Sequence, residues 1–483
     1  MIIPYGEYLP DMPALENPGA TVASNVMPAA KGYRPLRDMS AITSVMDAYG
    51  RGGIAVRDKD GNVSIYLGNA SKLYRAASPA LSDVSKVGGY TTGADERWEF
   101  VKWGEAVIAT NFTDAVQKST IGAAAFADLA GTPPKARHIG VVRDFVVLGN
   151  VFDASDGNVP HRVQWSAINN SDSWATSATT QADRQDIQDG GWVRAIVGGE
   201  YGVVFMEKQI VRMTYVGSPV IFQFDVVETG RGTAIPGSVV KLGANIFYWS
   251  ADGFYVLANG ASSQGIGSNK VDRTFTNDLD ADNYQRVSSA IDPINKLVVW
   301  SYPSVNSNGT PDKLAIFHWP TGRWSSANVT SQIVLSGQAF GYTMEGLDAL
   351  TTNMDTFTLS LDSKSLAGGA LALMGVTSLN ALGGFDGSYL EAVLETPEVE
   401  LSSRRAFLRS VRPLTDGASS SVVVRHRSRL ADSPTNSSAS AGNDIGECPT
   451  RISSRYFRIR ETISGGFTDA QGVSLDVVAE GAR

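Results

Sequence analysis

A weak hairpin motif recurs between residues 50 and 301 and constrains the fold more than any other feature of the sequence. Each copy has an apolar strand, a turn of two or three residues and a second strand with paired large hydrophobic residues. The pairs begin at Ile54, Val107, Val146, Val203, Ile246 and Val298. Their spacings of 53, 39, 57, 43 and 52 residues match the period of ~40–50 residues that is typical of propeller blades.

Each repeat has room for four short strands, which is the usual content of a blade. Few stretches of the chain sustain helical periodicity, and Gly, Asn, Asp and Pro separate the apolar bursts. The repeat therefore predicts an irregular β-propeller of about six blades in a mainly β protein. The alternative is a string of unrelated hairpins that form β-sandwiches.

The rest of the chain divides around this repeat. Residues 1–45 are expected to form an extended N-terminal arm, and residues 46–345 the propeller. Residues 346–385 are rich in Gly, Ala, Leu and Ser and indicate a bridging segment. Alternating strands return over residues 386–483, which predicts a small C-terminal β-sandwich-like module.

The N-terminal arm combines prolines with apolar side chains. Proline blocks helix and central-strand hydrogen bonding, so the arm is expected to be extended. An extended apolar segment without its own core must lie on another surface. That surface is either this chain's own propeller or a neighbouring subunit, so the arm supplies these candidate interface residues: Tyr5, Tyr8, Leu9 and Met12.

The C-terminal module is locally basic. Residues 404–460 hold eleven Arg, no Lys and four acidic residues. The period of two in a strand puts Arg425, Arg427 and Arg429 on one face, and Tyr456, Arg458 and Arg460 on one face of another strand. These five arginines are candidates for docking an acidic neighbouring subunit or nucleic acid. The alternative is a solvated sheet face with local ion pairs.

Charge and cysteine content exclude several classes of protein. Lys and Arg number 41 and Asp and Glu number 49, so the net charge is −8. This balance argues against a chain that grips phosphates with its whole surface. Cys448 is the single cysteine, so no intrachain disulfide can form. The start of the chain lacks a signal peptide pattern, and no apolar run reaches the ~20 residues of a membrane span.

No motif predicts catalysis or metal binding. The four histidines, His138, His161, His318 and His426, lie far apart in the sequence, and no nucleophile-elbow motif occurs. The acidic run that begins at Asp278 lacks the Gly and Glu of a calcium loop, and a surface helix over residues 275–289 accounts for it better. We therefore expect no enzyme and no catalytic, metal-binding or cofactor-binding residues.

The opening stretch PYGEYLPDMPALENPGATVASNVMPAAKGYRPL resembles the start of tail proteins from short-tailed bacteriophages (podoviruses). Further matching stretches are WEFVKWGEAVIATN, VQWSAINNSDSW, DIQDGGWVRAIVGGEYGVVFMEKQIVRMTYVG, AIDPINKLVVWSYPS, SLDSKSLAGG and RYFRIRETISGGFTDAQGVSLDV. The resemblance runs over nearly the whole chain. Members of this family are called tail nozzle, tail hub, tail tubular protein B or packaged-DNA stabilisation proteins.

The resemblance implies a virion structural protein that is made in the host cytoplasm and has no cofactor. Six copies would form a ring at the distal end of the tail, below an adaptor protein and in contact with fibre, spike or needle proteins. The ring would retain packaged double-stranded DNA and enclose its exit channel during ejection, without sequence-specific binding. The sequence assigns no residue to the lining of that channel.

Two other functions remain compatible with a propeller. A glycan-degrading enzyme would bring Asp or Glu side chains together from distant parts of the chain. A glycan-binding propeller would bind sugars without assembling into a ring.

Overall fold

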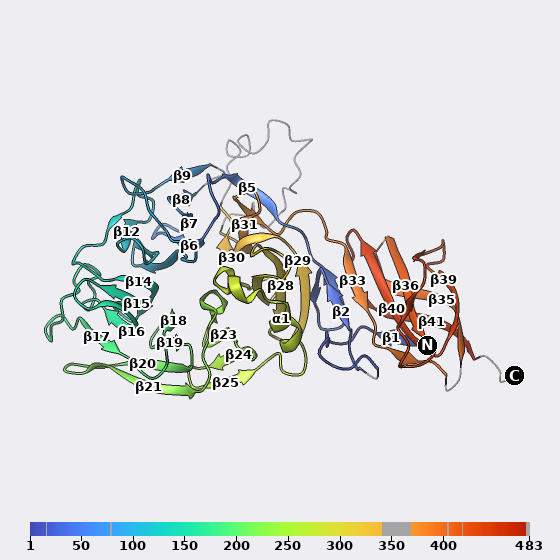
Figure 1. Ribbon diagram of the computed structural model, residues 1–483. Helices are drawn as coiled ribbons and strands as arrows, with labels where there is room; N and C mark the ends of the chain where they lie inside the picture. Colours follow the sequence, from blue (N-terminus) through green and yellow to red (C-terminus); the bar gives the residue numbers. More distant parts are fainter. Residues whose placement is uncertain (16, 78–79, 341–368, 403–404, 418, 480–483) are drawn as a thin grey trace.

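The computed structural model describes residues 1–479 apart from 16, 78–79, 341–368, 403–404 and 418. The described residues form a ring of small β-sheets beside a two-layered β module (Figure 1). The mainly β class, the propeller and the C-terminal sandwich-like module are thus confirmed. The ring contains seven four-stranded blades, which is one more than the repeat predicts.

In the first six blades, the strands follow one another along the chain and pair antiparallel with their neighbours. Blades one and two contain β6 (Gly52–Arg57), β7 (Val63–Gly68), β8 (Leu73–Ala76) and β9 (Leu81–Asp83), then β10 (Glu99–Trp103), β11 (Ala106–Thr110), β12 (Gln117–Thr120) and β13 (Ala127–Asp128). Blades three and four contain β14 (Lys135–Val142), β15 (Phe145–Asp153), β16 (Gly157–Trp165) and β17 (Asp183–Asp186), then β18 (Val193–Val197), β19 (Gly202–Met206), β20 (Gln209–Gly217) and β21 (Ile221–Thr229). Blades five and six contain β22 (Val240–Leu242), β23 (Asn245–Ser250), β24 (Gly253–Ala258) and β25 (Ser262–Gly265), then β26 (Ser288–Asp292), β27 (Leu297–Pro303), β28 (Pro311–His318) and β29 (Arg323–Asn328).

Both faces of each blade are buried, and this explains the paired hydrophobic residues of the repeat. Consecutive side chains of a strand point to opposite faces of its sheet. In β15, Val146 packs in a cluster with blade two and Val147 in a cluster with blade four. In β19, Val204 packs toward blade three, whereas Phe205 packs toward blade five beside Tyr248. Stacking of neighbouring blades therefore buries each pair on both sides.

The seventh blade closes the ring and is assembled from both ends of the propeller. It contains β30 (Ser331–Gln338), β31 (Leu371–Thr377), β32 (Ala381–Gly384) and, at its outer edge, β5 (Ser40–Val45). The predictions of six blades, of an arm that ends at residue 45 and of a bridging segment over 346–385 are therefore corrected. The strands of this blade lie too far apart in the sequence to repeat the motif, and residues 341–368 lie outside the described residues.

The first strand of each blade lies toward the centre of the ring. Contacts run from β6 through β10 and β14 to β18, and from β22 through β26 and β30 back to β6. Between these strands, the central channel contains a cavity of about 320 Å³. The loops that precede the inner strands surround one mouth of this channel.

The C-terminal module is a sandwich of two sheets with a shared apolar core. One sheet contains β1 (Ile2–Pro4), β3 (Val26–Pro28), β4 (Tyr33–Pro35), β41 (Ala470–Ala479), β35 (Ala406–Thr415) and β39 (Cys448–Ser454). The other contains β33 (Ala392–Glu395), β40 (Tyr456–Ser464) and β36 (Ser419–Arg427), with the short strands β34 (Val399–Glu400), β37 (Thr435–Asn436) and β38 (Ser440–Ala441). The core between the sheets includes Leu408, Val424, Ile459 and Leu475.

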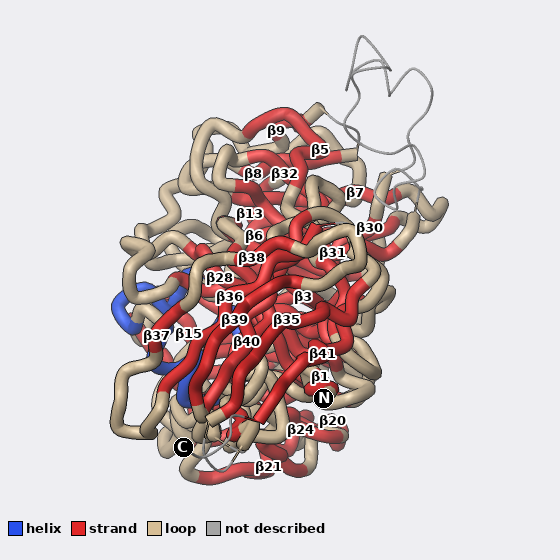
Figure 2. Tube along the Cα trace, turned by 90° about the vertical axis from the view of Figure 1, so that its right-hand side faces the viewer, coloured by secondary structure: helices blue, strands red, loops and turns tan. Residues whose placement is uncertain are grey.

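A strand of the N-terminal arm joins the propeller to the sandwich. β2 (Val22–Ser24) pairs with β29 of blade six through Ser24 and Ser326, and with β33 through Val22 and Glu395. Blade six and one layer of the sandwich thereby become a single 11-stranded sheet (Figure 1). Figure 2 shows the sandwich in front, with the paired strands β36 and β40 of one layer and the paired strands β35 and β39 of the other. Backbone hydrogen bonds therefore help to fix the orientation of the two domains.

The helix that we expected over residues 275–289 is split in two. α1 (Asp272–Asp278) precedes the 3-10 helix η2 (Ala281–Arg286), and a third short helix is η1 (Pro236–Ser238). The arm residue Asp11 accepts hydrogen bonds from the backbone N–H groups of Arg273 at 2.8 Å and Thr274 at 2.9 Å. The arm thus satisfies the first N–H groups of α1, which the helix itself leaves unpaired.

Candidate functional site

The arm residues that we predicted for a subunit interface lie mostly inside this chain. Tyr5, Tyr8 and Leu9 are 0%, 7% and 6% exposed, whereas Met12 is 37% exposed. Tyr5 and Tyr8 belong to the same hydrophobic cluster as the sandwich core and the tryptophans of blade six. The arm therefore covers its own chain, and the interface prediction for the three buried residues is corrected.

Tyr5 makes a buried hydrogen bond to the C-terminal sandwich. Its hydroxyl donates to Glu461 Oε2 on β40, and Glu461 is 0% exposed. Among the described residues, Glu461 Oε1 has no hydrogen-bond partner. Burial raises the pKa of Glu461 to about 7, although the hydrogen bond from Tyr5 opposes this shift. Below pH 7 the Glu461 carboxyl group is therefore mostly protonated and uncharged, at the point where the arm meets the sandwich.

Substitution of Glu461 by glutamine is expected to reduce the pH dependence of stability. The folded pKa of about 7 lies above the ordinary value of 4.5, so the stabilisation is complete below pH 4.5 and is lost as the pH rises through 7. The loss amounts to about 3 kcal/mol. Urea unfolding at pH 5 and pH 8 should show a smaller difference in Glu461→Gln than in the wild type. The exposed Glu391→Gln variant is the control, and equal pH dependence in all three proteins would contradict the assignment.

The arginines that we predicted for a docking face surround two buried carboxylates. Pairing of β36 with β40 sets Arg425 opposite Arg458, and pairing of β33 with β40 sets Glu395 opposite Arg460. Arg458 lies between the two acids, with nitrogen atoms 3.8 Å from Glu395 and 3.7 Å from Glu398. The predicted faces of the two strands therefore meet in one cluster, except that Arg429 lies beyond the end of β36.

The two carboxylates bind the remaining arginines at short range. Glu395 Oε2 accepts from Arg460 Nε at 2.7 Å and from Arg425 Nη1 at 3.2 Å. Glu398 Oε1 accepts from Arg427 Nε at 2.7 Å. Glu395 and Glu398 are only 1% and 2% exposed. We call these two acids and their four arginines the arginine–glutamate cluster.

The arginine–glutamate cluster corrects the docking-face prediction. Its four arginines form local ion pairs, which was the alternative interpretation. Arg429 lies apart, with an 82% exposed side chain 2.9 Å from Asp432. The partners were missed because Glu395 and Glu398 precede the basic segment over 404–460. The acidic run ETPEVE directly before that segment was the signal for them.

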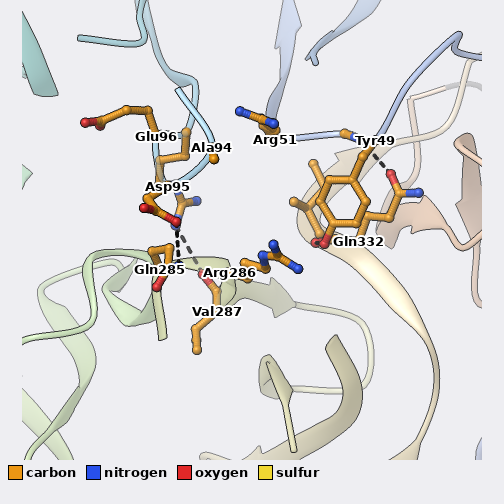
Figure 3. Close-up of a pocket in the computed structure, with 12 residues that line it drawn as sticks. Tyr49, Arg51, Ala94, Asp95, Glu96, Gln285, Arg286, Val287 and Gln332 are labelled. Atoms are coloured by element: carbon orange, nitrogen blue, oxygen red, sulfur yellow. Dashed lines mark hydrogen bonds between the residues drawn. The ribbon is translucent and has the colours of Figure 1, made fainter. Parts of the chain in front are cut away.

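Another group of charged residues lies at one mouth of the central channel of the propeller. Arg51, Arg97 and Arg286 each come one or two residues before the first strand of a blade, and they line a cavity of about 290 Å³. Figure 3 shows Arg51 and Arg286 in this cavity near Tyr49. We call it the mouth pocket. These arginines were not predicted from the sequence, although a basic residue just before three inner strands was the available signal.

Backbone carbonyl oxygens hold the three arginines in place. Arg51 Nη1, Arg97 Nη1 and Arg286 Nη1 each donate to a carbonyl. The acceptors are Thr92 at 3.0 Å, Val287 at 3.1 Å and Gly309 at 2.9 Å, respectively. Within the described part of the chain, none of the three forms an ion pair with a carboxylate within 4.0 Å. Burial lowers the pKa of Arg51, and the nearby Arg286 guanidinium lowers it further.

The acidic residues of the mouth pocket interact with other groups. Glu96 Oε1 accepts from Arg137 Nη2 at 2.8 Å, and Asp95 Oδ1 accepts from Gln285 Nε2 at 3.0 Å. An adjoining cavity shares Asp95, Glu96 and Gln285 with the mouth pocket and also contains Trp192, which is 43% exposed. The mouth therefore presents guanidinium groups and an aromatic surface.

Glu99 and His138 form a pair at the start of the channel. His138 Nδ1 lies 3.0 Å from Glu99 Oε1, and the Ile139 N–H donates to Glu99 Oε2 at 3.3 Å. Burial would raise the pKa of Glu99, but His138, Arg97 and the Ile139 amide together lower it below its ordinary value. The arrangement thus stabilises an ionised carboxylate beside the mouth pocket.

The described residues contain no group of three or more His, Cys, Asp or Glu side chains that could hold a metal ion. Among the same residues, no helix is both long and apolar enough to cross a bilayer.

Comparisons with known proteins concern the fold alone. No family model and no curated protein matches the chain. Similar solved structures include the extracellular domain of BT4673 from B. thetaiotaomicron, with 9% identity, a TM-score of 0.43 and coverage of 78% of this chain. This chain spans only 43% of the length of that protein. The Pan2 WD40 domain of Neurospora crassa is 7% identical with a TM-score of 0.38, and the match covers 63% of this chain and 90% of that domain.

Proposed function

We propose that this chain is a structural component of a short phage tail. Six copies form a nozzle or hub ring that encloses the DNA exit channel, retains the packaged genome and contributes to ejection. The resemblance to short-tailed phage proteins over nearly the whole chain supports this proposal.

The continuous 11-stranded sheet is the structural observation that carries the proposal. It joins blade six, β2 of the arm and one layer of the sandwich by backbone hydrogen bonds. A ring component that bears pressure from packaged DNA needs domains of fixed orientation. Pairing of β5 with β32 adds stiffness because backbone hydrogen bonds join the start of the propeller to its last blade.

The charge distribution suits a channel that DNA passes without being held. The chain carries a net charge of −8, and DNA affinity depends on cations that replace counterions on phosphates. The arginine–glutamate cluster neutralises part of the basic C-terminal segment within the chain. We propose transient passage of double-stranded DNA without sequence-specific binding.

The proposed partners follow from the place of such a ring in the tail. An adaptor protein lies above it, and fibre, spike or needle proteins contact it from outside. The exposed residues Met12 and Arg429 remain candidate contacts for these partners or for a second copy. The protein is made in the host cytoplasm, acts in the virion, and has neither a catalytic role nor a cofactor.

Phage particles assembled without this chain are expected to lose their DNA, because the exit channel is then not closed. The measurement is the amount of DNase-protected DNA per particle, and restoring the gene on a plasmid is the control. Particles that retain DNA and eject it normally would contradict the proposal. Retained DNA with loss of attachment to host glycans would support the alternative of a glycan-binding or glycan-degrading propeller.

A further inference from the structure

We propose that the mouth pocket binds an oxyanion, a carboxylate or phosphate group, carried by a small molecule. Arg51, Arg97 and Arg286 come from blade one, blade two and η2 and line the same cavity of about 290 Å³.

None of these arginines is in direct contact with a carboxylate of the described residues. Each guanidinium donates from Nη1 to a neutral backbone carbonyl, and none lies within 4.0 Å of a described carboxylate. The pocket contains two acids. Glu96 is paired with Arg137, and the Asp95 carboxylate accepts a hydrogen bond from Gln285. Glu99 interacts with Arg97 at longer range, but its carboxylate is already bonded to His138 and the Ile139 amide. The three guanidinium groups therefore lie near Asp95 and Glu99 without a direct ion-pair partner among the described residues. Grouped cations of this kind are stabilised by a bound anion.

The backbone positions are also suited to holding these groups. A Cβ atom at Gly237 would lie only 2.0 Å from Arg97 Nη1 and 1.8 Å from the Val287 carbonyl oxygen. The absence of a side chain at Gly237 thus makes room for the Arg97 guanidinium against that carbonyl. Arg97 Nε is buried and has no hydrogen-bond partner in the part of the chain that the structure describes. An arginine fixed in this way loses little freedom when it binds a planar carboxylate or a phosphate.

The size and lining of the pocket favour a small ligand over a polymer. A volume of about 290 Å³ lies at the lower end of the range for small-molecule sites. Tyr49, Val287 and Ile333 supply apolar surface beside the arginines, and Tyr49 lies under Arg286 with 5.9 Å between the guanidinium and the ring centre. In the adjoining cavity, the Arg194 guanidinium lies over the Trp192 ring at 5.1 Å, and the exposed part of that ring offers a further surface for a sugar.

Isothermal titration of the full chain at low ionic strength tests this proposal. The probes are inorganic phosphate, glucuronate as a carboxylated sugar, and glucose as its neutral counterpart. We expect phosphate, glucuronate or both to bind and glucose not to bind. The relative affinities of phosphate and glucuronate show whether the pocket prefers a phosphate or a carboxylate group. Tighter binding of either one supports the proposed site.

Arg51→Gln and Arg286→Gln should each weaken anion binding about tenfold or more, because a charge-assisted hydrogen bond is lost. Arg409→Gln on the sandwich, where the side chain is 57% exposed, should leave it unchanged. Thermal unfolding without ligand checks that the variants are folded, and Arg286→Lys should bind with intermediate affinity. Three results would overturn the proposal: no anion binding, equal binding of glucose, or unchanged affinity in both Gln variants.

Discussion

Replacing Glu395 with alanine is expected to destabilise the C-terminal sandwich by about 3–5 kcal/mol. Glu395 is 1% exposed and lies within 4.0 Å of nitrogen atoms of Arg425, Arg458 and Arg460. Its removal leaves three guanidinium groups on one sheet face with Glu398 as the remaining buried acid. Partly buried positive charges without a partner are costly because water cannot solvate them fully.

Glu400→Ala is the matched control for this substitution. Glu400 also pairs with an arginine of the sandwich, Arg455, at 2.8 Å, but the two side chains are 34% and 39% exposed. Solvent screens such a pair, so its loss should cost less than about 1 kcal/mol. The free energy of unfolding in urea, with hydrogen exchange of β33, β36 and β40, distinguishes the two variants. Equal stability of Glu395→Ala and Glu400→Ala would show that the buried cluster contributes no more than a surface pair.

Truncation of Ile42 to alanine is expected to cost about 2–5 kcal/mol and to weaken closure of the propeller. Ile42 is 1% exposed in β5 and packs in a cluster with Leu335, Met374 and Leu382. The first and last parts of the propeller are joined in this blade by strand pairing rather than by chain connectivity. A cavity at Ile42 therefore weakens the one blade that holds the ring closed.

Val45→Ala in the same strand is the control, because Val45 is 63% exposed. We expect Val45→Ala to change stability by less than about 0.5 kcal/mol. Urea unfolding gives the stability, and limited proteolysis between β5 and β6 reports release of the strand. If the two variants unfold and are cleaved alike, β5 does not contribute to closure as described.

The sequence repeat predicted the propeller because burial of both blade faces requires apolar residues at adjacent positions of one strand. A blade packed between two others must be apolar on both faces. Adjacent residues such as Val146 and Val147 point to opposite faces, so both are apolar. The seventh blade could not be found in the same way. Its strand β5 comes from residues 40–45 and its inner strands from residues 331–384, so no single stretch contains the motif.

The candidate sites were harder to predict because their partners are distant in the sequence. Alternation placed Arg458 and Arg460 on one face correctly, but no local pattern shows that Glu395 of the neighbouring strand pairs with both of them. Likewise, the first five blades lie between Arg51 and Arg286 in the sequence. The two residues line the same pocket only because the ring closes. Tyr5 was expected to need a covering surface, and the strand pairing of β1 with β41 supplies it within the same chain.

Cryo-electron microscopy of the native phage particle that contains this chain tests the central claim most directly. We predict six copies in a ring around an axial channel that is continuous with the portal, each with its propeller and sandwich joined through β2. A monomeric propeller, or a peripheral trimer away from the channel, would contradict the proposed nozzle.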